Sequence, residues 1–243
     1  MIWRVRHFDQ IESTNTWLAA QALEGAPEGL VAFADFQTKG RGRLDRTWSA
    51  ASGTALLCSV LLRPALDLDE MQLGVAAVSL AVRAATVRLC GVRPDLKWPN
   101  DLLVGDRKVG GVLAEVVATS DGVALVVGVG VNLTDCPEGA TSLAQVAGVT
   151  VAPRAMLDIV LEELETRRDA LDDVDGRAAV HAQYERALAT LGQLVRVEMH
   201  GTHHVGVARA VDAAGRLILE VDGEDHVVSA GDVVHVRPHD GGS

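Results

Sequence analysis

One segment of the chain constrains the fold more than any other: residues 37–48, which read Q-T-K-G-R-G-R-L-D-R-T-W. Its two glycines allow left-handed or closely approaching backbone, and its three arginines are planar, permanently charged groups that match carboxylates and phosphates in two-point contacts. Apolar runs typical of strands flank it, L-V-A-F-A-D-F before and T-A-L-L-C-S-V-L-L after. We therefore predict an anion-binding loop that a folded core holds at both ends.

Arginine-glycine runs also occur in nucleic-acid-binding tails, so this alternative needs weighing. Here the run is neither terminal nor repeated, and the chain of 243 residues has a formal net charge of −11. Affinity for nucleic acid rests mostly on pairing phosphates with Lys and Arg. The composition therefore disfavours a polyanionic partner.

Composition also bounds the core and the compartment. Hydrophobic residues make up 48% of the chain but aromatic residues only 3%, so the core is expected to consist mainly of Val, Leu and Ala. We find no run of about 18 apolar residues and no signal-peptide pattern at the N-terminus, so we expect no membrane span and no secretion. Cys58, Cys90 and Cys136 are scattered without C-x-x-C spacing, which fits a reducing cytoplasm.

The pattern of elements changes along the chain. Strand-like runs at 4–11, 30–36 and 55–62 alternate with helical runs, two β-rich stretches follow the hairpin signal Gly105-Asp106, and residues 153–191 are helical. From Gly192 onward, five short alternating strands separated by Gly/Asp turns indicate a small barrel. We place a domain boundary near 190, which gives an α/β (α+β) domain over 1–190 and a β domain over 191–243.

Three further motifs accompany the arginine-rich loop. Ser13-Thr14-Asn15 alone is typical of an ordinary helix cap. Lys97-Trp98-Pro99-Asn100-Asp101 is followed by R-K-V-G-G-V-L-A-E, where the paired glycines indicate a close approach to the backbone. Gly128-Val129-Gly130-Val131-Asn132 leaves one face of a strand bare, and it lacks the third glycine and helix of a dinucleotide fingerprint.

These motifs together, in this order and spacing, resemble those of biotin–protein ligases, from about residue 9 to 135. The resemblance implies a class II aminoacyl-tRNA synthetase-like mixed sheet with helices, followed by a small SH3-like β-barrel. It implies that biotin and ATP form biotinyl-5′-AMP and that the acyl group then passes to a lysine of a biotin carboxyl carrier protein, the carrier of an acyl-CoA carboxylase. Mg²⁺ is expected to enter with ATP, held largely by phosphates and water.

The resemblance also implies roles for individual residues. Lys97 and Arg43 are the expected catalytic residues, with Lys97 bridging the biotin carboxylate and the α-phosphate. The residues expected to bind biotin are Ser13, Thr14, Asn15, Gln37, Arg41, Gly42, Arg43, Lys97, Gly111, Leu113 and Gly128. Those expected to bind the nucleotide are Arg43, Arg46, Trp48, Asn132 and Arg209. We name no metal ligand.

Two departures from the family pattern bear on the prediction. Asp45 stands where the family loop usually has glycine; aspartate tolerates a positive φ, but it adds a negative charge beside the phosphate-binding arginines. Only 12 residues precede Ser13, fewer than the roughly 50 that a winged-helix module needs. We therefore expect a ligase without DNA-binding repressor activity.

Three alternatives remain open at this stage. A lipoate–protein ligase or octanoyltransferase has a related fold and also modifies carrier lysines, although the G-R-G-R and K-W-P-N-D motifs favour biotin. A non-catalytic biotin-binding regulator is disfavoured by the presence of Lys97 and Asn132. His200, His203 and His204 are a possible metal site, although surface histidines without further ligands nearby are the more frequent case.

Overall fold

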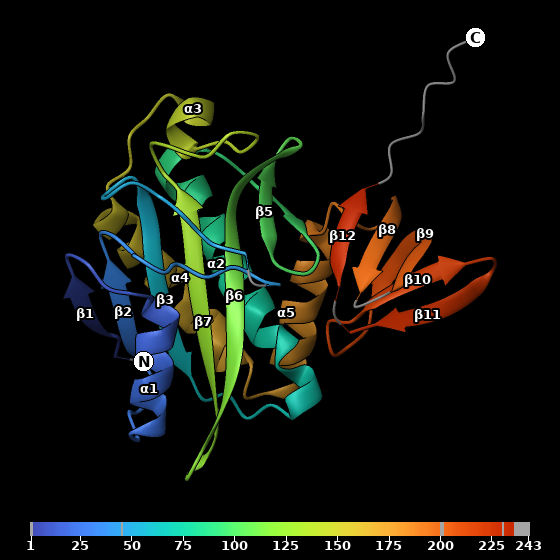
Figure 1. Cartoon of the computed structure of the whole chain (residues 1–243). Helices are drawn as coiled ribbons and strands as arrows, with labels where there is room; N and C mark the ends of the chain where they lie inside the picture. Colours follow the sequence, from blue (N-terminus) through green and yellow to red (C-terminus); the bar gives the residue numbers. More distant parts are fainter. Residues whose placement is uncertain (1, 45, 200–201, 230, 236–243) are drawn as a thin grey trace.

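The computed structural model consists of a seven-stranded mixed sheet with helices, followed by a five-stranded antiparallel sheet (Figure 1). It describes residues 2–44, 46–199, 202–229 and 231–235. The first sheet has the order β1-β2-β3-β7-β6-β5-β4, in which β1 and β2 are parallel and the other neighbours antiparallel. Its strands are β1 Arg4–Phe8, β2 Leu30–Ala34, β3 Ala55–Leu62, β4 Asp95–Lys97, β5 Asp101–Val104, β6 Arg107–Thr119 and β7 Gly122–Asn132.

Helices cover both faces of this sheet, and local sequence signals set their ends. Helix α1 lies on one face, while α2, α4 and α5 pack on the other (Figure 1). Ser13 caps α1 because its Oγ accepts a hydrogen bond from the Thr16 N–H, and Gly91 ends α2 with a φ of 70°. The helices are α1 Thr14–Leu23, η1 Leu68–Glu70, α2 Gln72–Cys90, α3 Leu143–Ala147, α4 Pro153–Ala170 and α5 Val174–Ala187.

The helical region expected over 153–191 is divided in two. Three residues separate the two helices, and the last of them, Asp173, caps α5 by accepting a hydrogen bond from the Gly176 N–H. A Cβ at Gly176 would lie 2.3 Å from the Ala170 carbonyl oxygen, so the turn between the helices needs glycine there. The sequence analysis did not resolve this break.

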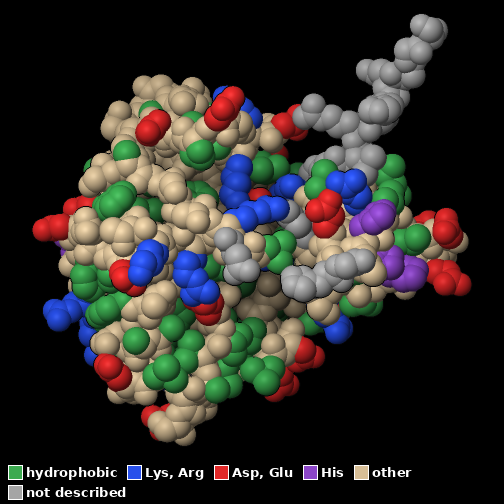
Figure 2. All heavy atoms as spheres, viewed as in Figure 1, with side chains coloured by type: hydrophobic (Ala, Val, Ile, Leu, Met, Phe, Trp, Pro, Cys, Tyr) green, Lys and Arg blue, Asp and Glu red, His purple; other side chains and the backbone are tan. Residues whose placement is uncertain are grey.

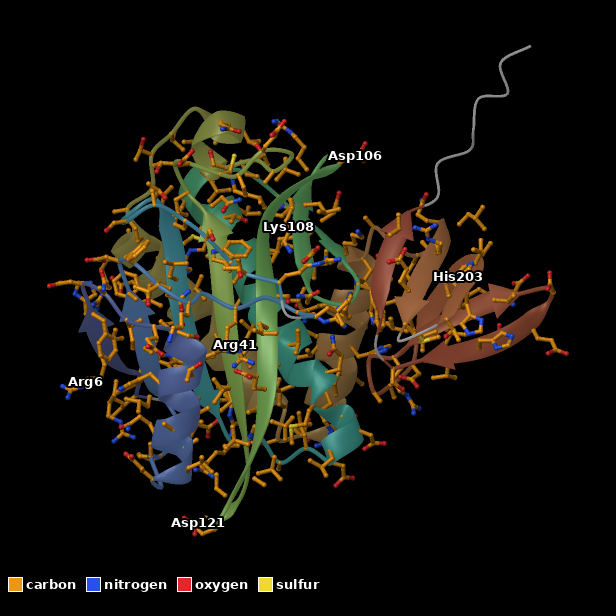
Figure 3. All side chains as sticks on the ribbon, in the orientation of Figure 1. Arg6, Arg41, Asp106, Lys108, Asp121 and His203 are labelled. Atoms are coloured by element: carbon orange, nitrogen blue, oxygen red, sulfur yellow. The ribbon has the colours of Figure 1, made fainter. Side chains whose placement is uncertain are left out.

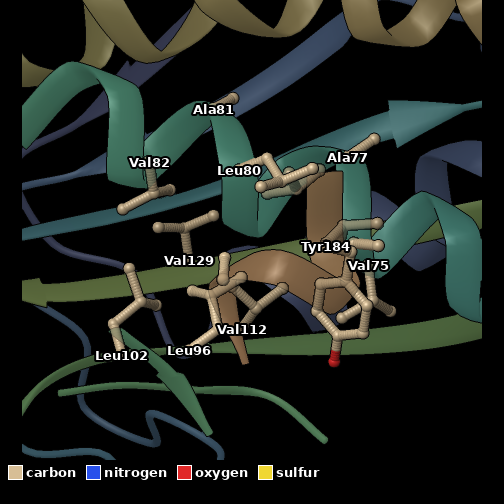
Figure 4. Packing of buried hydrophobic residues seen from close by; sticks show 14 of the residues in the cluster. Val75, Ala77, Leu80, Ala81, Val82, Leu96, Leu102, Val112, Val129 and Tyr184 are labelled. Carbon is tan, nitrogen blue, oxygen red and sulfur yellow. The ribbon is translucent and has the colours of Figure 1, made fainter. Parts of the chain in front are cut away.

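Helix α2 is the centre of the core. Val75, Leu80 and Val82 of this helix pack against strand residues such as Val112 and Val129 (Figure 4). The stretch Leu68–Cys90 is long and apolar enough to cross a membrane by length and composition, and 67% of its apolar window is buried inside the fold. Packing between the sheet and the helices α4 and α5 accounts for this composition.

The second sheet has the order β11-β10-β9-β8-β12 and packs onto the same core as the first. Hydrogen bonds link each strand to the next in this order, and none joins β11 to β12 within the described residues. The mixed α/β sheet with a β part after it, expected from the sequence, is confirmed, whereas the boundary near 190 stays a prediction. The strands are β8 Leu194–Met199, β9 Thr202–Val211, β10 Leu217–Val221, β11 Glu224–Val228 and β12 Asp232–His235.

Candidate active site

A cavity opens on the α1 face of the first sheet, between the start of α1, the loop 37–48 and the strands β6 and β7. Figure 3 labels Arg41, from the loop, and Lys108, which belongs to β6. The residues that line the cavity are Ser13, Thr14, Asn15, Gln37, Arg41, Gly42, Arg43, Leu44, Arg46, Thr47, Trp48, Leu57, Asn100, Asp101, Lys108, Gly111, Val112, Leu113, Gly128, Val129 and Gly130.

The first turn of α1 is tied to Gln37, the first residue of the loop. The backbone N–H of Thr14 donates to Oε1 of Gln37 at 2.7 Å, and the Thr14 hydroxyl lies 3.0 Å from the same oxygen. The amide oxygen of Gln37 is therefore occupied, while its amide nitrogen has no partner within the described residues. Gln37 thus presents a fixed N–H donor at one end of the cavity.

A buried polar chain continues from this point across the sheet. Oγ of Ser59 on β3 lies 2.7 Å from Thr14 Oγ1 and 2.6 Å from Asn15 Oδ1. The Asn15 amide nitrogen donates to the Leu113 carbonyl at 3.2 Å and to Glu115 Oε2 at 3.0 Å. Arg41 Nη1 donates to the other carboxylate oxygen of Glu115 at 2.6 Å. Ser59 and Glu115, which sequence reasoning missed, thus connect residues that it predicted.

The arginine-rich loop is closed as a small hairpin. The Gly42 N–H donates to the Arg46 carbonyl at 2.7 Å and the Trp48 N–H to the Gly40 carbonyl at 3.0 Å. Leu44 has a φ of 52°, a conformation that costs a residue other than glycine about 1–3 kcal/mol when a functional loop holds it. Asp45, where the positive φ was expected, lies outside the described residues.

Arg43 extends from this hairpin toward the second sheet. Its Nη1 donates to the Gly231 carbonyl at 3.0 Å and lies 3.4 Å from Asn100 Oδ1. The loop therefore contacts the residue directly before β12 and the turn between β4 and β5.

The glycines of β7 make room for side chains of the site. A Cβ at Gly128 would lie 2.2 Å from Asn15 Oδ1, and one at Gly130 would lie 2.5 Å from Cε2 of the Trp48 indole. The indole N–H of Trp48 is buried without a hydrogen-bond partner within the described residues, which costs about 1–3 kcal/mol unless a ligand accepts the bond. The bare strand face expected from the sequence thus accommodates Asn15 and Trp48.

Lys108 supplies the ammonium group of the cavity. Its Nζ lies 2.5 Å from Asp101 Oδ1 and 5.8 Å from the centroid of the Trp48 ring. A Cβ at Gly111 would lie 3.3 Å from both Cε and Nζ of Lys108, so glycine lets this side chain lie along the strand. The motif R-K-V-G-G-V-L-A-E carried the signal for Lys108, since its lysine stands directly before the paired glycines.

Three of the expected site residues do not line the cavity, and Lys97 is the most important of them. Lys97 ends the edge strand β4, opposite Asp101 of β5, and does not line the cavity, whereas Lys108 of β6 does. The catalytic role expected for Lys97 stays a prediction. Asn132 is buried and donates to the Thr141 carbonyl at 3.0 Å. Arg209 pairs with Glu220 at 3.1 Å in the second sheet.

The charge of the cavity is opposite to that of the whole chain. Figure 2 shows Lys and Arg side chains near the middle of the face viewed, with most Asp and Glu side chains around the periphery. Among the described residues, Arg41, Arg43, Arg46 and Lys108 line the cavity, against one lining carboxylate, Asp101. Such a concentration of cations on a chain of net charge −11 favours a small anionic ligand.

Groups outside the cavity do not add to this chemistry. Burial raises the pKa of Cys58, the neighbour of Ser59, to about 12, which leaves its thiol protonated and non-nucleophilic. His7, Asp9 and Asp35 hold ligand atoms within 4.8 Å of one another at the exposed ends of β1 and β2. Of the histidines considered as a metal site, His200 lies outside the described residues, and His204 stacks on His226.

Comparison with known proteins identifies the family. A family model described as the biotin/lipoate A/B protein ligase family matches residues 7–132, and one described as the biotin protein ligase C terminal domain matches residues 190–236. The chain belongs to the biotin/lipoate A/B protein ligase family. The resemblance drawn from the motifs is thereby confirmed.

Individual members of the family narrow the assignment to biotin. The chain is 39% identical to biotin–[acetyl-CoA-carboxylase] ligase of Mycobacterium tuberculosis, covering 94% of this chain and 87% of that protein. It is 33% identical to the ligase of the same description from Paracoccus denitrificans, covering 91% and 96%. A solved biotin protein ligase from Aquifex aeolicus, in complex with biotin and ATP, superposes with a TM-score of 0.81 at 26% identity, covering 96% of this chain and 98% of that one.

Proposed function

We propose that this protein is a biotin–[acetyl-CoA-carboxylase] ligase that activates biotin with ATP and transfers it to a lysine of a carrier protein. In the first step a carboxylate oxygen of biotin attacks the α-phosphorus, the bond to pyrophosphate breaks and biotinyl-5′-AMP forms. In the second step the lysine amine attacks the acyl carbon, AMP leaves and the amine loses a proton. The observation that supports this best is a cavity with amide and hydroxyl groups at one end and cations at the other.

The polar end of the cavity suits the ureido ring of biotin, which has one carbonyl and two N–H groups. Ser13, Thr14, Asn15 and Gln37 offer hydroxyl and amide groups there, and Leu113 and Gly128 border the same space. Because the amide oxygen of Gln37 accepts from Thr14, its amide N–H remains available to donate to the ureido oxygen. We assign these side chains to recognition of the ring.

The cationic end suits the reacting anions. Attack of a carboxylate on a phosphate brings two negative charges together, and cations placed beforehand stabilise the charge that develops. We assign Arg41 to the biotin carboxylate, with Arg43 and Arg46 at the phosphates and Trp48 at the nucleotide. Lys108 is assigned to the oxygens between carboxylate and α-phosphate, the role that sequence reasoning assigned to Lys97.

Mg²⁺ is proposed as part of the ATP substrate, and the structure offers a limited set of ligands for it. Asp101 is the one carboxylate that lines the cavity in the described part of the chain, and it is paired with Lys108. This fits an ion held mainly by phosphate oxygens and water. The unpaired thiols Cys58, Cys90 and Cys136 agree with a reducing cytoplasm as the location.

Incubation with ATP, Mg²⁺ and labelled biotin tests the function. We expect pyrophosphate release that depends on biotin, a bound mixed anhydride, and labelling of one lysine once the carrier domain is added. Lipoate and octanoate, the substrates of the related alternative, serve as competing acids. Faster pyrophosphate release with lipoate than with biotin would move the assignment to the other branch of the family.

A further inference from the structure

Glu115 does not line the cavity, but its carboxylate contacts two residues that do. One oxygen accepts from Asn15 Nδ2 at 3.0 Å, and the other accepts from Arg41 Nη1 at 2.6 Å. These partners stand 100 and 74 positions away along the chain. Glu115 is on β6, where it is paired with Val126 of β7, so the two contacts start from the sheet and not from a loop.

The contact with Asn15 determines which way the amide points. A carboxylate accepts hydrogen bonds, so Glu115 requires the nitrogen of Asn15, and the Leu113 carbonyl requires it as well. The amide oxygen then faces Ser59, whose hydroxyl donates to it at 2.6 Å. Because Asn15 also lies against Gly128, where a Cβ would be 2.2 Å from its Oδ1, the side chain is held in one place and one orientation.

The contact with Arg41 restricts a long side chain that is otherwise half exposed. The side chain of Arg41 is 49% accessible, against 26% for Glu115. Without Glu115, the Arg41 side chain would stay mobile until a ligand bound. Binding would then carry the entropy cost of ordering the side chain, which lowers affinity. Glu115 uses Nη1 of the guanidinium and leaves the remaining N–H groups available for an anion.

We propose that Glu115 is a positioning residue for the adenylation, one that places both ends of biotin relative to a single group on the sheet. Through Asn15 it sets the amide that faces the ureido ring, and through Arg41 it sets the guanidinium that faces the carboxylate. The proposal rests on the function proposed above. It deepens that function by naming a residue that acts without touching the substrate.

Substitution Glu115→Gln tests this with little change of shape. A glutamine has one acceptor oxygen, so its NH₂ group must face either the Asn15 amide nitrogen or the Arg41 guanidinium, donor against donor. We expect the Kd of biotin, measured by calorimetry without ATP, to rise roughly tenfold to hundredfold. Glu12→Gln is the matched control, because Glu12 holds Lys39 of the same loop at 2.8 Å from the exposed side, and biotin affinity is expected to be unchanged there.

A neutral ligand separates the two contacts of Glu115. Biotin methyl ester keeps the ureido ring and lacks the carboxylate, so its binding reports on Asn15 but not on the charge of Arg41. We expect Glu115→Gln to weaken biotin more than the ester. Equal weakening of both ligands would remove Arg41 from the proposal. Unchanged biotin binding would overturn the proposal, and so would tighter binding, which would mean that Glu115 competes with the ligand.

A second variant keeps the proposal testable if Glu115→Gln fails to fold. Glu115→Asp keeps the charge and removes one methylene group, so the carboxylate no longer reaches both Asn15 Nδ2 and Arg41 Nη1. Biotin is then expected to lose affinity roughly tenfold, and the ester is expected to lose less. Wild-type protein in the same calorimetry and pyrophosphate assays tests the proposed function separately. An inactive wild type refutes the function. An active wild type, with variants that bind biotin equally well, refutes the positioning role.

Discussion

At the scale of single residues, two lysines with similar sequence surroundings differ in whether they line the cavity. Lys97 and Lys108 stand in neighbouring motifs, and each is followed within a few residues by turn or glycine signals. Lys108 lines the cavity beside Asp101 and Trp48, whereas Lys97 belongs to the edge strand β4. The cavity wall contains Lys108 and not Lys97, while the catalytic role that the sequence motifs gave to Lys97 stays a prediction.

Paired substitutions of the two lysines check this placement. We expect Lys108→Ala to lower the rate of biotin-dependent pyrophosphate release about a hundredfold or more, as for other groups that stabilise developing charge. Lys97→Ala is expected to stay close to wild type, because Lys97 does not line the cavity. The opposite pattern in a steady-state assay of both variants would return the catalytic role to Lys97.

Gly128 allows a second test at this scale. A Cβ at this position would displace Asn15, whose Oδ1 is 2.2 Å away, and break its bonds to Ser59 and Glu115. We expect Gly128→Ala to raise the KM for biotin roughly tenfold to hundredfold, since two or three hydrogen bonds of about 1 kcal/mol each are lost. The KM for ATP in the same variant is the control, and equal changes in both KM values would contradict the assignment.

At the scale of elements, local signals determined most boundaries. The cap at Ser13 and the apolar run of β3 occur where the sequence predicted them, because capping and strand periodicity depend on residues close in the chain. The break between α4 and α5 was missed because the residues between them, L-D-D, include no proline or glycine that would mark it. Helix α4 is anchored by Arg168, which is 5% exposed and forms ion pairs with Glu28 and Asp172.

This anchor predicts a pH dependence of stability. Burial alone would raise the pKa of Asp172, but the Ala65 N–H and the Arg168 and Arg177 guanidinium groups outweigh it and hold the pKa below its ordinary value. The contribution of Asp172 to the free energy of unfolding is therefore present above about pH 4 and is lost as the pH falls through the lowered pKa.

Urea denaturation of Asp172→Asn measures this contribution. The difference in unfolding free energy from wild type is expected to shrink as the pH is lowered from 7 to about 3. Asp158→Asn, which removes the more exposed pair of Arg154 and Asp158 on the same helix, is the matched control. A difference for Asp172→Asn that does not vary with pH would refute the role of the ionised carboxylate.

At the scale of the whole molecule, one buried tryptophan joins the two sheets. Trp98 is 1% exposed, and its backbone N–H donates to Thr190 Oγ1 at 2.9 Å. Its indole N–H donates to the Gly215 carbonyl, 117 positions away, at 2.9 Å. Together with Arg43 at Gly231, this contact brings the second sheet to the edge of the cavity.

Trp98→Phe removes the indole N–H while keeping an aromatic ring in the core. We expect the free energy of unfolding to fall by about 1–3 kcal/mol, because the Gly215 carbonyl is left without its donor. Trp3→Phe is the matched control, since the Trp3 indole N–H has no hydrogen-bond partner within the described residues. Chemical denaturation of both variants decides the point, and equal losses would argue against a specific role for the bond to Gly215.

The amino-acid sequence by itself determined the strands and caps, the anion-binding loop and the family to which the chain belongs. Each of these depends on short-range periodicity, on backbone freedom at glycine, or on motifs read in order. Only the tertiary structure decided that Lys108 rather than Lys97 reaches the cavity and that Asn132 binds the Thr141 carbonyl. It alone brought Glu115 to Asn15 and Arg41, because strand order and register, which place distant residues side by side, arise from pairing between segments far apart in the chain.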